Sequence, residues 1–241
     1  MILEGLIKGK LLKRYKRFFV DCELEDGEIV TAHCANTGSM KSLLDEGNEV
    51  WIQENPNPKA KLKYKLQIMR TKTGALCCVN TMLPNKIVFE GIENGSIVEL
   101  KDFTEIKSEV KYGEENSRID VWTKDRDGAE SFIEVKNTTL VEDELENVAQ
   151  FPDSVTTRGA KHLRELAKEA VRGNRAVMVY LINREDGNKF RIANDIDPKY
   201  KEEFDLAKKE GLEVLPYKSK IVIDSKGNCE ITVEEKVELI P

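Results

Sequence analysis

The chain has 241 residues, of which 40% are hydrophobic and 34% are charged, and its formal net charge at pH 7 is −6. This balance excludes an intrinsically disordered chain and leaves room for one large domain or two smaller ones. The five cysteines are odd in number and lack C-x-x-C spacing, so the sequence predicts neither a disulfide framework nor a zinc ribbon.

The charges are unevenly distributed along the chain. Residues 1–80 hold 13 Lys and Arg against 10 Asp and Glu, whereas residues 81–241 hold 25 against 34. Because the first part is mildly basic, the protein can have a nucleic-acid partner although its net charge is negative. The first residues lack the pattern of a signal peptide, and the longest apolar run, residues 176–182, is far shorter than the roughly 20 residues that span a bilayer. We therefore expect a cytoplasmic protein without a membrane partner.

The first 80 residues alternate short strand patterns with turn signals. Five or six short strands with one small helix indicate a closed barrel of the oligonucleotide-binding (OB) type, which we assign to residues 1–80. The expected strands cover residues 6–12, 18–24, 28–34, 48–54, 61–70 and 75–79, and the expected short helix covers residues 40–44.

From residue 83 onward, longer helical patterns alternate with strands. The continuous apolar run 176–182 suits a buried central strand. Together these elements predict an α/β (α+β) domain with a mixed sheet at residues 81–241. The expected helices cover residues 84–94, 154–172 and 198–210, and the expected strands cover residues 105–112, 117–123, 131–136, 176–182 and 212–215.

Two of these strands form a predicted hairpin that carries three charged residues. Its centre falls near Asp127, so Asp120 and Glu134, each seven residues away, are expected to face each other, with Lys136 on the same side. Two carboxylates suit a hard divalent cation, and because the chain has only two histidines, Mg²⁺ or Mn²⁺ is expected. Such a cation polarises a phosphodiester and lowers the pKa of a bound water, while Lys136 orients that water or neutralises phosphate charge.

A cross-strand salt-bridge cluster on a solvated sheet face is the alternative for these three residues. The apolar neighbours Phe132, Ile133 and Val135 favour a partly buried strand, where three charged groups need a function.

Cations interleaved with aromatic residues near the N-terminus are typical of a phosphate-tracking groove, although a solvated edge strand has the same pattern. Other candidates lie on a predicted strand face, at the start of the short helix, and on one face of helix 154–172; for these, an ordinary cap or a solvated face is the alternative. The nucleic-acid-binding candidates are Arg14, Lys16, Arg17, Asn36, Thr37, Lys61, Lys63, Arg118, Arg158 and His162.

Six stretches give the chain a resemblance, along essentially its whole length, to the sugar fermentation stimulation protein A family. They are RYKRF at 14–18, TAHCANTGSM at 31–40, NTMLPN at 80–85, EVKYGEENSRID at 109–120, EVKNTTLVE at 134–142 and FPDSVTTRGAKHLREL at 151–166. The resemblance implies an OB-like barrel, a second domain of the PD-(D/E)XK nuclease fold, and DNA binding with little or no sequence specificity. It also makes Asp120 the motif aspartate, Glu134 and Lys136 the E-x-K pair, and Glu90 a third metal-site acid, although the residues alone favour an exposed helix glutamate at position 90.

Three functional hypotheses follow. The first is a metal-dependent nuclease acting on DNA, which the intact set of Asp120, Glu134 and Lys136 favours. The second is a non-catalytic, non-specific DNA-binding regulator of sugar (maltose) metabolism on a nuclease fold. The third is an enzyme acting on RNA or on a nucleotide-like small molecule. The oligomeric state is not fixed by the sequence.

Overall fold

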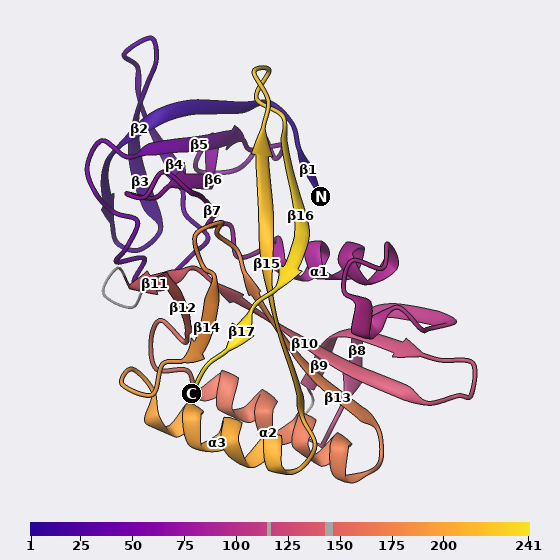
Figure 1. Ribbon diagram of the computed structural model, residues 1–241. Coiled ribbons are helices and arrows are strands. Elements are labelled where there is room, and N and C mark those ends of the chain that lie inside the picture. Colours follow the sequence, from indigo (N-terminus) through magenta and orange to yellow (C-terminus); the bar gives the residue numbers. More distant parts are fainter. Residues whose placement is uncertain (115–116, 143–146) are drawn as a thin grey trace.

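The computed structural model describes residues 1–114, 117–142 and 147–241. A small barrel from the first part of the chain sits on one end of a layered α/β domain (Figure 1). The predicted fold class is confirmed: an OB-type barrel precedes a mixed-sheet domain of the kind expected for a nuclease fold.

The barrel is closed by a pairing between strands that are not adjacent in sequence. Its strand order is β4-β3-β2-β5-β6-β7, and β4 pairs in parallel with β6 to complete the ring. The buried side chains of these strands, among them Leu11, Val20, Ile52 and Leu66, form a core of their own. The strands are β2 (Leu6–Tyr15), β3 (Phe19–Leu24), β4 (Ile29–His33), β5 (Glu49–Glu54), β6 (Tyr64–Arg70) and β7 (Leu76–Cys78).

Two predictions for the barrel are wrong. Residues 40–44 form a turn instead of a helix, because Met40 adopts a left-handed backbone conformation (φ 51°) and directs the chain into the barrel core. The strand expected at residues 61–70 is β6, which begins at Tyr64. The amide of Asn55 bonds to the carbonyl of Lys63 at 2.6 Å, so residues 55–63 form a loop.

The central sheet of the second domain has seven strands in the order β1-β16-β15-β13-β10-β9-β8. β10, β13 and β15 are parallel, and the remaining pairs are antiparallel, so the sheet is mixed as predicted. β13 contains the apolar run 176–182 and lies in the middle of the sheet. The strands are β1 (Ile2–Leu3), β8 (Glu105–Tyr112), β9 (Ser117–Lys124), β10 (Glu130–Thr138), β13 (Arg175–Ile182), β15 (Glu213–Ile223) and β16 (Cys229–Lys236).

Three helices cover the two faces of this sheet (Figure 1). Helix α1 (Pro84–Glu93) packs with Ile133, Val135 and Val177 on one face, whereas α2 (Thr157–Val171) and α3 (Pro198–Lys209) pack with Phe132 and Met178 on the other. Successive residues of β10 and β13 therefore enter opposite cores, as the period of a strand requires. A 3-10 turn, η1 (Val98–Leu100), follows α1.

Several elements were not predicted from the sequence. β16 was not expected, and β15 is much longer than the strand expected at residues 212–215. A second sheet consists of β11 (Leu140–Glu142), β12 (Val148–Phe151), β14 (Lys189–Ile192) and β17 (Glu238–Leu239). β1 pairs with β16, so the first residues of the chain join the sheet of the second domain. The division of the chain at residue 80 stays a prediction.

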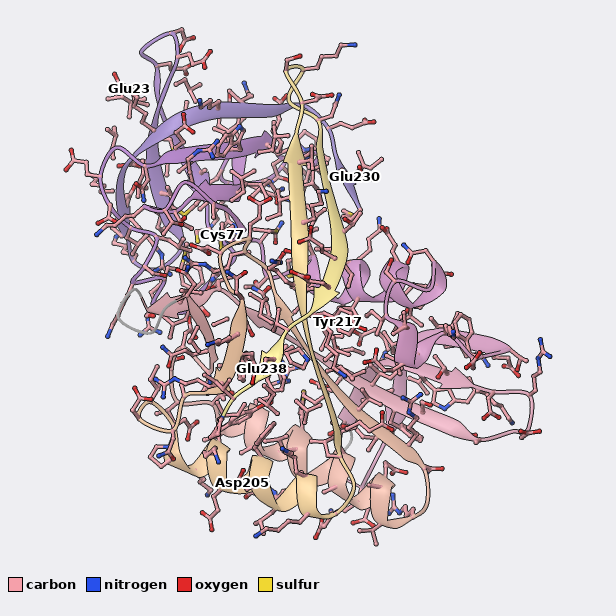
Figure 2. The ribbon with its side chains drawn as sticks, in the orientation of Figure 1. Glu23, Cys77, Asp205, Tyr217, Glu230 and Glu238 are labelled. Carbon is pink, nitrogen blue, oxygen red and sulfur yellow. The ribbon has the colours of Figure 1, made fainter. Side chains whose placement is uncertain are left out.

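Arg184 forms a buried polar contact at the seam between the barrel and the second domain. Its side chain is 2% exposed, forms an ion pair with Asp186, and donates to the hydroxyl of Ser42 and the carbonyl of Thr139, both at 2.9 Å. Its backbone forms a β-bridge with Cys77, which Figure 2 shows at this seam. One guanidinium therefore joins residues of both domains.

The neighbouring backbone strengthens the same seam. The amide of Cys78 bonds to the carbonyl of Asn183 at 2.8 Å, and the amide of Leu76 bonds to the carboxylate of Glu185 at 2.9 Å. Buried backbone groups must be paired, so these bonds fix how the barrel meets the sheet. No helix in the described part of the chain combines the length and apolar character needed to cross a membrane.

The Arg184→Met variant tests the role of this seam. Removing one member of a buried ion pair leaves Asp186 as a poorly compensated charge, so the free energy of unfolding should fall by about 3–5 kcal/mol in urea titrations. The control is Arg164→Met, which removes an exposed pair with Glu203 and should lower it by less than about 1 kcal/mol. Equal losses in the two variants would contradict the assigned role.

Candidate metal and nucleic-acid site

The hairpin of β9 and β10 brings Asp120, Glu134 and Lys136 together. The pairing of Ile133 with Val121 makes Asp120 and Glu134 the next opposite positions. The amide of Val135 donates to Asp120 Oδ2 at 2.7 Å, and Lys136 Nζ donates to Glu134 Oε1 at 2.6 Å. The three side chains therefore lie at the end of the paired part of the hairpin, and their role in metal binding stays a prediction.

Glu134 is buried, and its two carboxylate oxygens have different surroundings. Oε1 accepts hydrogen bonds from Lys136 and from Nδ1 of His162, whereas the buried Oε2 has no hydrogen-bond partner among the described residues. Burial raises the pKa of Glu134, but the charge of Lys136 and the bond from His162 outweigh it and lower that pKa below its ordinary value. Glu134 is thus an ionised buried carboxylate with one oxygen left to accept.

Asp120 lies at the edge of a cavity of about 650 Å³. Burial, with a further contribution from the charge of Glu134, raises its pKa from 3.8 to about 7, although the bonds from Val135 and Asn85 oppose the rise. Asn85 Nδ2 donates to Asp120 Oδ1 at 2.7 Å. The raised pKa of Asp120 therefore reports first its burial and second the nearby charge of Glu134.

Helix α2 supplies the partner of Glu134. Thr156 caps the helix by accepting from the amide of Gly159, and a Cβ on Gly159 would lie 2.9 Å from the ring of Tyr200 on α3. This close packing sets the position of His162 one turn later. Arg158 Nε donates to His162 Nε2 at 3.4 Å, which is consistent with His162 using its Nδ1–H on Glu134.

Sequence reasoning missed two residues of this cavity. Asn85 faces Asp120 from the first turn of α1, and Glu109 lies on β8 between Ser108 and Val110, which pair with the two neighbours of Asp120. Glu109 has a left-handed backbone (φ 56°), which a sequence pattern does not reveal. The cavity is lined by Thr81, Met82, Asn85, Lys86, Phe89, Ser108, Glu109, Asp120 and Arg158.

The prediction that Glu90 joins the metal site is wrong. Its carboxylate lies 2.6 Å from the N-terminal amine of Met1. Glu90 is five residues beyond Asn85 on α1, so the two side chains point to different sides of the helix, and Asn85 is the one that reaches Asp120.

Arg14, a predicted nucleic-acid contact, bonds to backbone carbonyls in this structure, and its binding of nucleic acid stays a prediction. Its guanidinium donates to the carbonyls of Arg17, Asn36, Gly38 and Ser39, at distances from 2.8 to 3.3 Å. Through these bonds the guanidinium connects the β2–β3 turn to the loop at residues 36–39. In the free protein, Arg14 thus has a structural role.

Lys16 and Arg17 form the exposed turn between β2 and β3, and both have a left-handed backbone, with φ of 48° and 64°. Non-glycine residues rarely adopt this conformation without a structural reason. The next residue, Phe18, is 45% exposed and stacks on His33. Glu23, at the opposite end of β3, lies at the outer end of the barrel (Figure 2), so the cationic turn faces the second domain.

Asn36 and Thr37 precede no helix, so the predicted phosphate site at a helix start is wrong. Asn36 Oδ1 accepts from the amide of Gly38 at 2.8 Å, and the amide of Ser39 donates to Asp153 at 3.1 Å. The loop thereby contacts the second domain, and Asn36 and Thr37 line a separate cavity there.

The remaining candidates lie on exposed surfaces. Lys61 and Lys63 are in the loop before β6; Lys63 is 3.7 Å from Glu54 and packs over Tyr64. They therefore do not form the predicted row on one strand face. Arg118 is exposed on β9, two residues before Asp120.

The donors at the site suit a hard cation that retains water ligands. Among residues 1–114, 117–142 and 147–241, no three His, Cys, Asp or Glu side chains form a ready-made metal cluster. Mg²⁺ commonly binds through one or two carboxylates together with waters and substrate phosphate. The available Glu134 Oε2 and the raised pKa of Asp120 fit such a cation.

Comparisons with known proteins agree with the observed architecture. Residues 12–79 match the family model described as the SfsA N-terminal OB domain, and residues 82–225 match the sugar fermentation stimulation protein RE domain. A sugar fermentation stimulation protein homolog of Pelagibacter ubique is 46% identical over 98% of this chain and 97% of its own length. One from Marinomonas sp. is 46% identical over 92% of this chain and 84% of its own.

A solved structure is also similar. It is SfsA of Pyrococcus furiosus in complex with Ca²⁺, with 26% sequence identity and a TM-score of 0.85 over 100% of this chain and 98% of that one. The agreement extends over both domains, so their arrangement is common to the two proteins.

The Asp120→Asn variant tests the strain between the two carboxylates. The folded-state pKa of about 7 lies above the ordinary value of 3.8, so the stability that Asp120 contributes at low pH is lost as the pH rises through 7. In EDTA, the variant should melt about 2–4 °C above wild type near pH 8, with a smaller difference near pH 5. The amide of Asn85 can turn to keep its bond.

Added Mg²⁺ should reverse this order, because only the wild-type protein keeps both carboxylates for binding. A variant that melts below wild type in EDTA at the higher pH would contradict the assigned repulsion.

Proposed function

The chain belongs to the sugar fermentation stimulation protein family, and we propose that it binds DNA and hydrolyses phosphodiester bonds with Mg²⁺ or Mn²⁺ held by Asp120 and Glu134. One observation carries the proposal: a buried, ionised Glu134 keeps an unused oxygen beside Asp120, whose pKa is raised to about 7. Divalent cations bind where such carboxylates converge.

The bound cation would polarise the phosphodiester and lower the pKa of a water ligand. The protein residues have separate tasks. Lys136, held 2.6 Å from Glu134, orients the attacking water or neutralises charge that develops on phosphate. His162 holds the Glu134 carboxylate in position, and Arg158, exposed at the cavity, contacts a substrate phosphate. Asn85 fixes the orientation of Asp120.

A non-catalytic DNA-binding protein is the second candidate, and one observation favours it. Glu134 Oε1 already accepts from Lys136 and His162, so part of its charge is compensated without a cation. A fold that had lost catalysis would keep this arrangement for stability alone.

Cleavage of labelled single- and double-stranded DNA and RNA, with Mg²⁺, Mn²⁺ or EDTA, tests the nuclease. We expect metal-dependent cleavage that falls at least about 100-fold in Asp120→Asn and in Lys136→Met, because each removes a group that acts in the transition state. Glu90→Gln is the matched control: it changes a carboxylate that pairs with the N-terminus, and it should cleave normally. If no substrate is cleaved and DNA binding is intact, the nuclease is excluded and the non-catalytic DNA-binding protein is supported.

DNA binding through the cationic turn is tested separately. In the double variant Lys16→Gln, Arg17→Gln, the affinity for single-stranded DNA in EDTA should fall. The slope of log affinity against log salt should weaken by about 1.4, because each lost phosphate contact contributes about 0.7. The control is Lys208→Gln, Lys209→Gln, on the last turn of α3, which should leave the slope unchanged. Equal slopes in all three proteins would exclude the turn as a phosphate contact.

A further inference from the structure

A second cavity, of about 280 Å³, lies where the barrel meets the second domain. Its lining consists of residues 35–38 from the barrel and residues from β10 and β12 of the second domain. Thr81 lines both this cavity and the cavity that contains Asp120, so it lies between the two. Its volume corresponds to about nine waters at roughly 30 Å³ each, enough for one planar ring group with a few waters.

Gln150 on β12 is the unusual residue of this cavity. It is 1% exposed, and both its amide nitrogen and its amide oxygen are without a hydrogen-bond partner in the described part of the protein. In contrast, the other buried glutamine, Gln67, bonds through both amide atoms, to Gln53 and Asn80. Buried amides are normally paired, so the Gln150 amide lacks a partner that a ligand in the cavity can supply.

The charge of the cavity excludes a phosphate as that ligand. Its described lining residues include no Lys or Arg, and they include the carboxylate of Asp153. A phosphate would be repelled there, whereas a neutral group with donors and acceptors would be accepted. Phe151, next to Gln150 in sequence, adds an aromatic wall, which suits a planar ring.

The junction cavity lies between the cationic turn and the Asp120 cavity, the two parts of the protein proposed above to contact DNA. On one side, Arg14 bonds to the carbonyls of both Arg17 and Asn36, so the cationic turn is tied directly to the cavity wall. On the other side, Thr81 leads to the Asp120 cavity. A strand that runs from the turn to Asp120 passes this opening.

We propose that the junction cavity receives one unpaired nucleobase of the bound strand and that Gln150 reads its edge. The side-chain amide offers a donor and an acceptor side by side, the pattern that pairs with the edge of a base in a bidentate manner. This inference rests on the proposed nucleic-acid function. It adds that the protein acts on strands with an unpaired base, and that the base contributes to binding.

Binding of single-stranded dA, dC and dT oligonucleotides of about 12 nucleotides, in EDTA, tests the proposal. The wild-type protein should distinguish its preferred homopolymer from the weakest by at least about fivefold, the lower range for a bidentate base contact. Gln150→Leu should bring the three affinities within about twofold of one another. It should not lower the melting temperature, because the lost amide has no partner in the free protein.

Gln67→Leu is the matched control, since it removes a satisfied buried amide in the barrel. It should melt lower than wild type and keep the wild-type order of affinities. A second readout is 2-aminopurine placed at successive positions of the dA strand: one position should become strongly fluorescent with wild type and not with Gln150→Leu, because its base leaves the stack.

The outcomes separate this proposal from the proposed function. Equal affinities for the three strands in wild type, or an unchanged order in Gln150→Leu, would overturn the base site while leaving salt-dependent binding and metal-dependent cleavage intact. A wild-type protein that binds none of the strands would overturn the base site, and cleavage of double-stranded DNA would then decide the proposed function separately. Loss of discrimination in Gln150→Leu alone supports the base site.

Discussion

The burial of Glu134 beside Asp120 is the constraint on which the rest of the site depends. An ionised carboxylate inside a protein requires compensation, which Lys136 supplies from the same strand and His162 supplies from α2. The second partner fixes α2 against the sheet, and the close contact of Gly159 with α3 holds it there. On the opposite face, α1 is positioned by its apolar core and by one polar contact to Asp120. The two carboxylates thus link the hairpin to two helices that the apolar cores also hold.

The barrel is joined to this framework in one orientation, with consequences for function. The ion pair of Arg184 and the backbone bonds of β7 hold it at the seam, and the loop at residues 36–39 contacts Asp153. The cationic β2–β3 turn therefore lies toward the second domain, and the outer end of the barrel carries Glu23 instead (Figure 2). The cationic turn and the acidic pair are separate in sequence, and the junction cavity is linked to both, because Arg14 bonds to Asn36 in its wall and Thr81 lines both cavities.

The sequence predicted the parts of the fold that local interactions determine. The hairpin register follows from its turn, so Asp120 and Glu134 could be placed one position beyond the pair of Ile133 with Val121, and the apolar run 176–182 correctly predicted the central strand. Tertiary contacts decide the rest. Tertiary packing decides which face of α1 meets the sheet. The sequence therefore suggested Glu90 as the α1 residue of the site, whereas Asn85 is the one that contacts Asp120. A sequence does not reveal whether an arginine bonds to backbone carbonyls or is free to bind a phosphate, and so the carbonyl bonds of Arg14 were not expected. The strands of the second sheet have two to four residues, too few for a pattern.

Under the proposed function, local charge explains how an acidic protein with a net charge of −6 would act on a polyanion. Without a cation, Asp120 and Glu134 would repel a phosphate at the point where it must approach. Under the proposed function, metal binding and substrate binding at this point are therefore coupled, and each should strengthen the other. The junction cavity differs because its described lining has no cation to attract a phosphate. Discrimination there must come from hydrogen bonds to Gln150, which are insensitive to salt. Affinity and base preference should therefore respond differently to ionic strength: salt weakens the hold of Lys16 and Arg17 on the backbone and leaves the preference among bases unchanged.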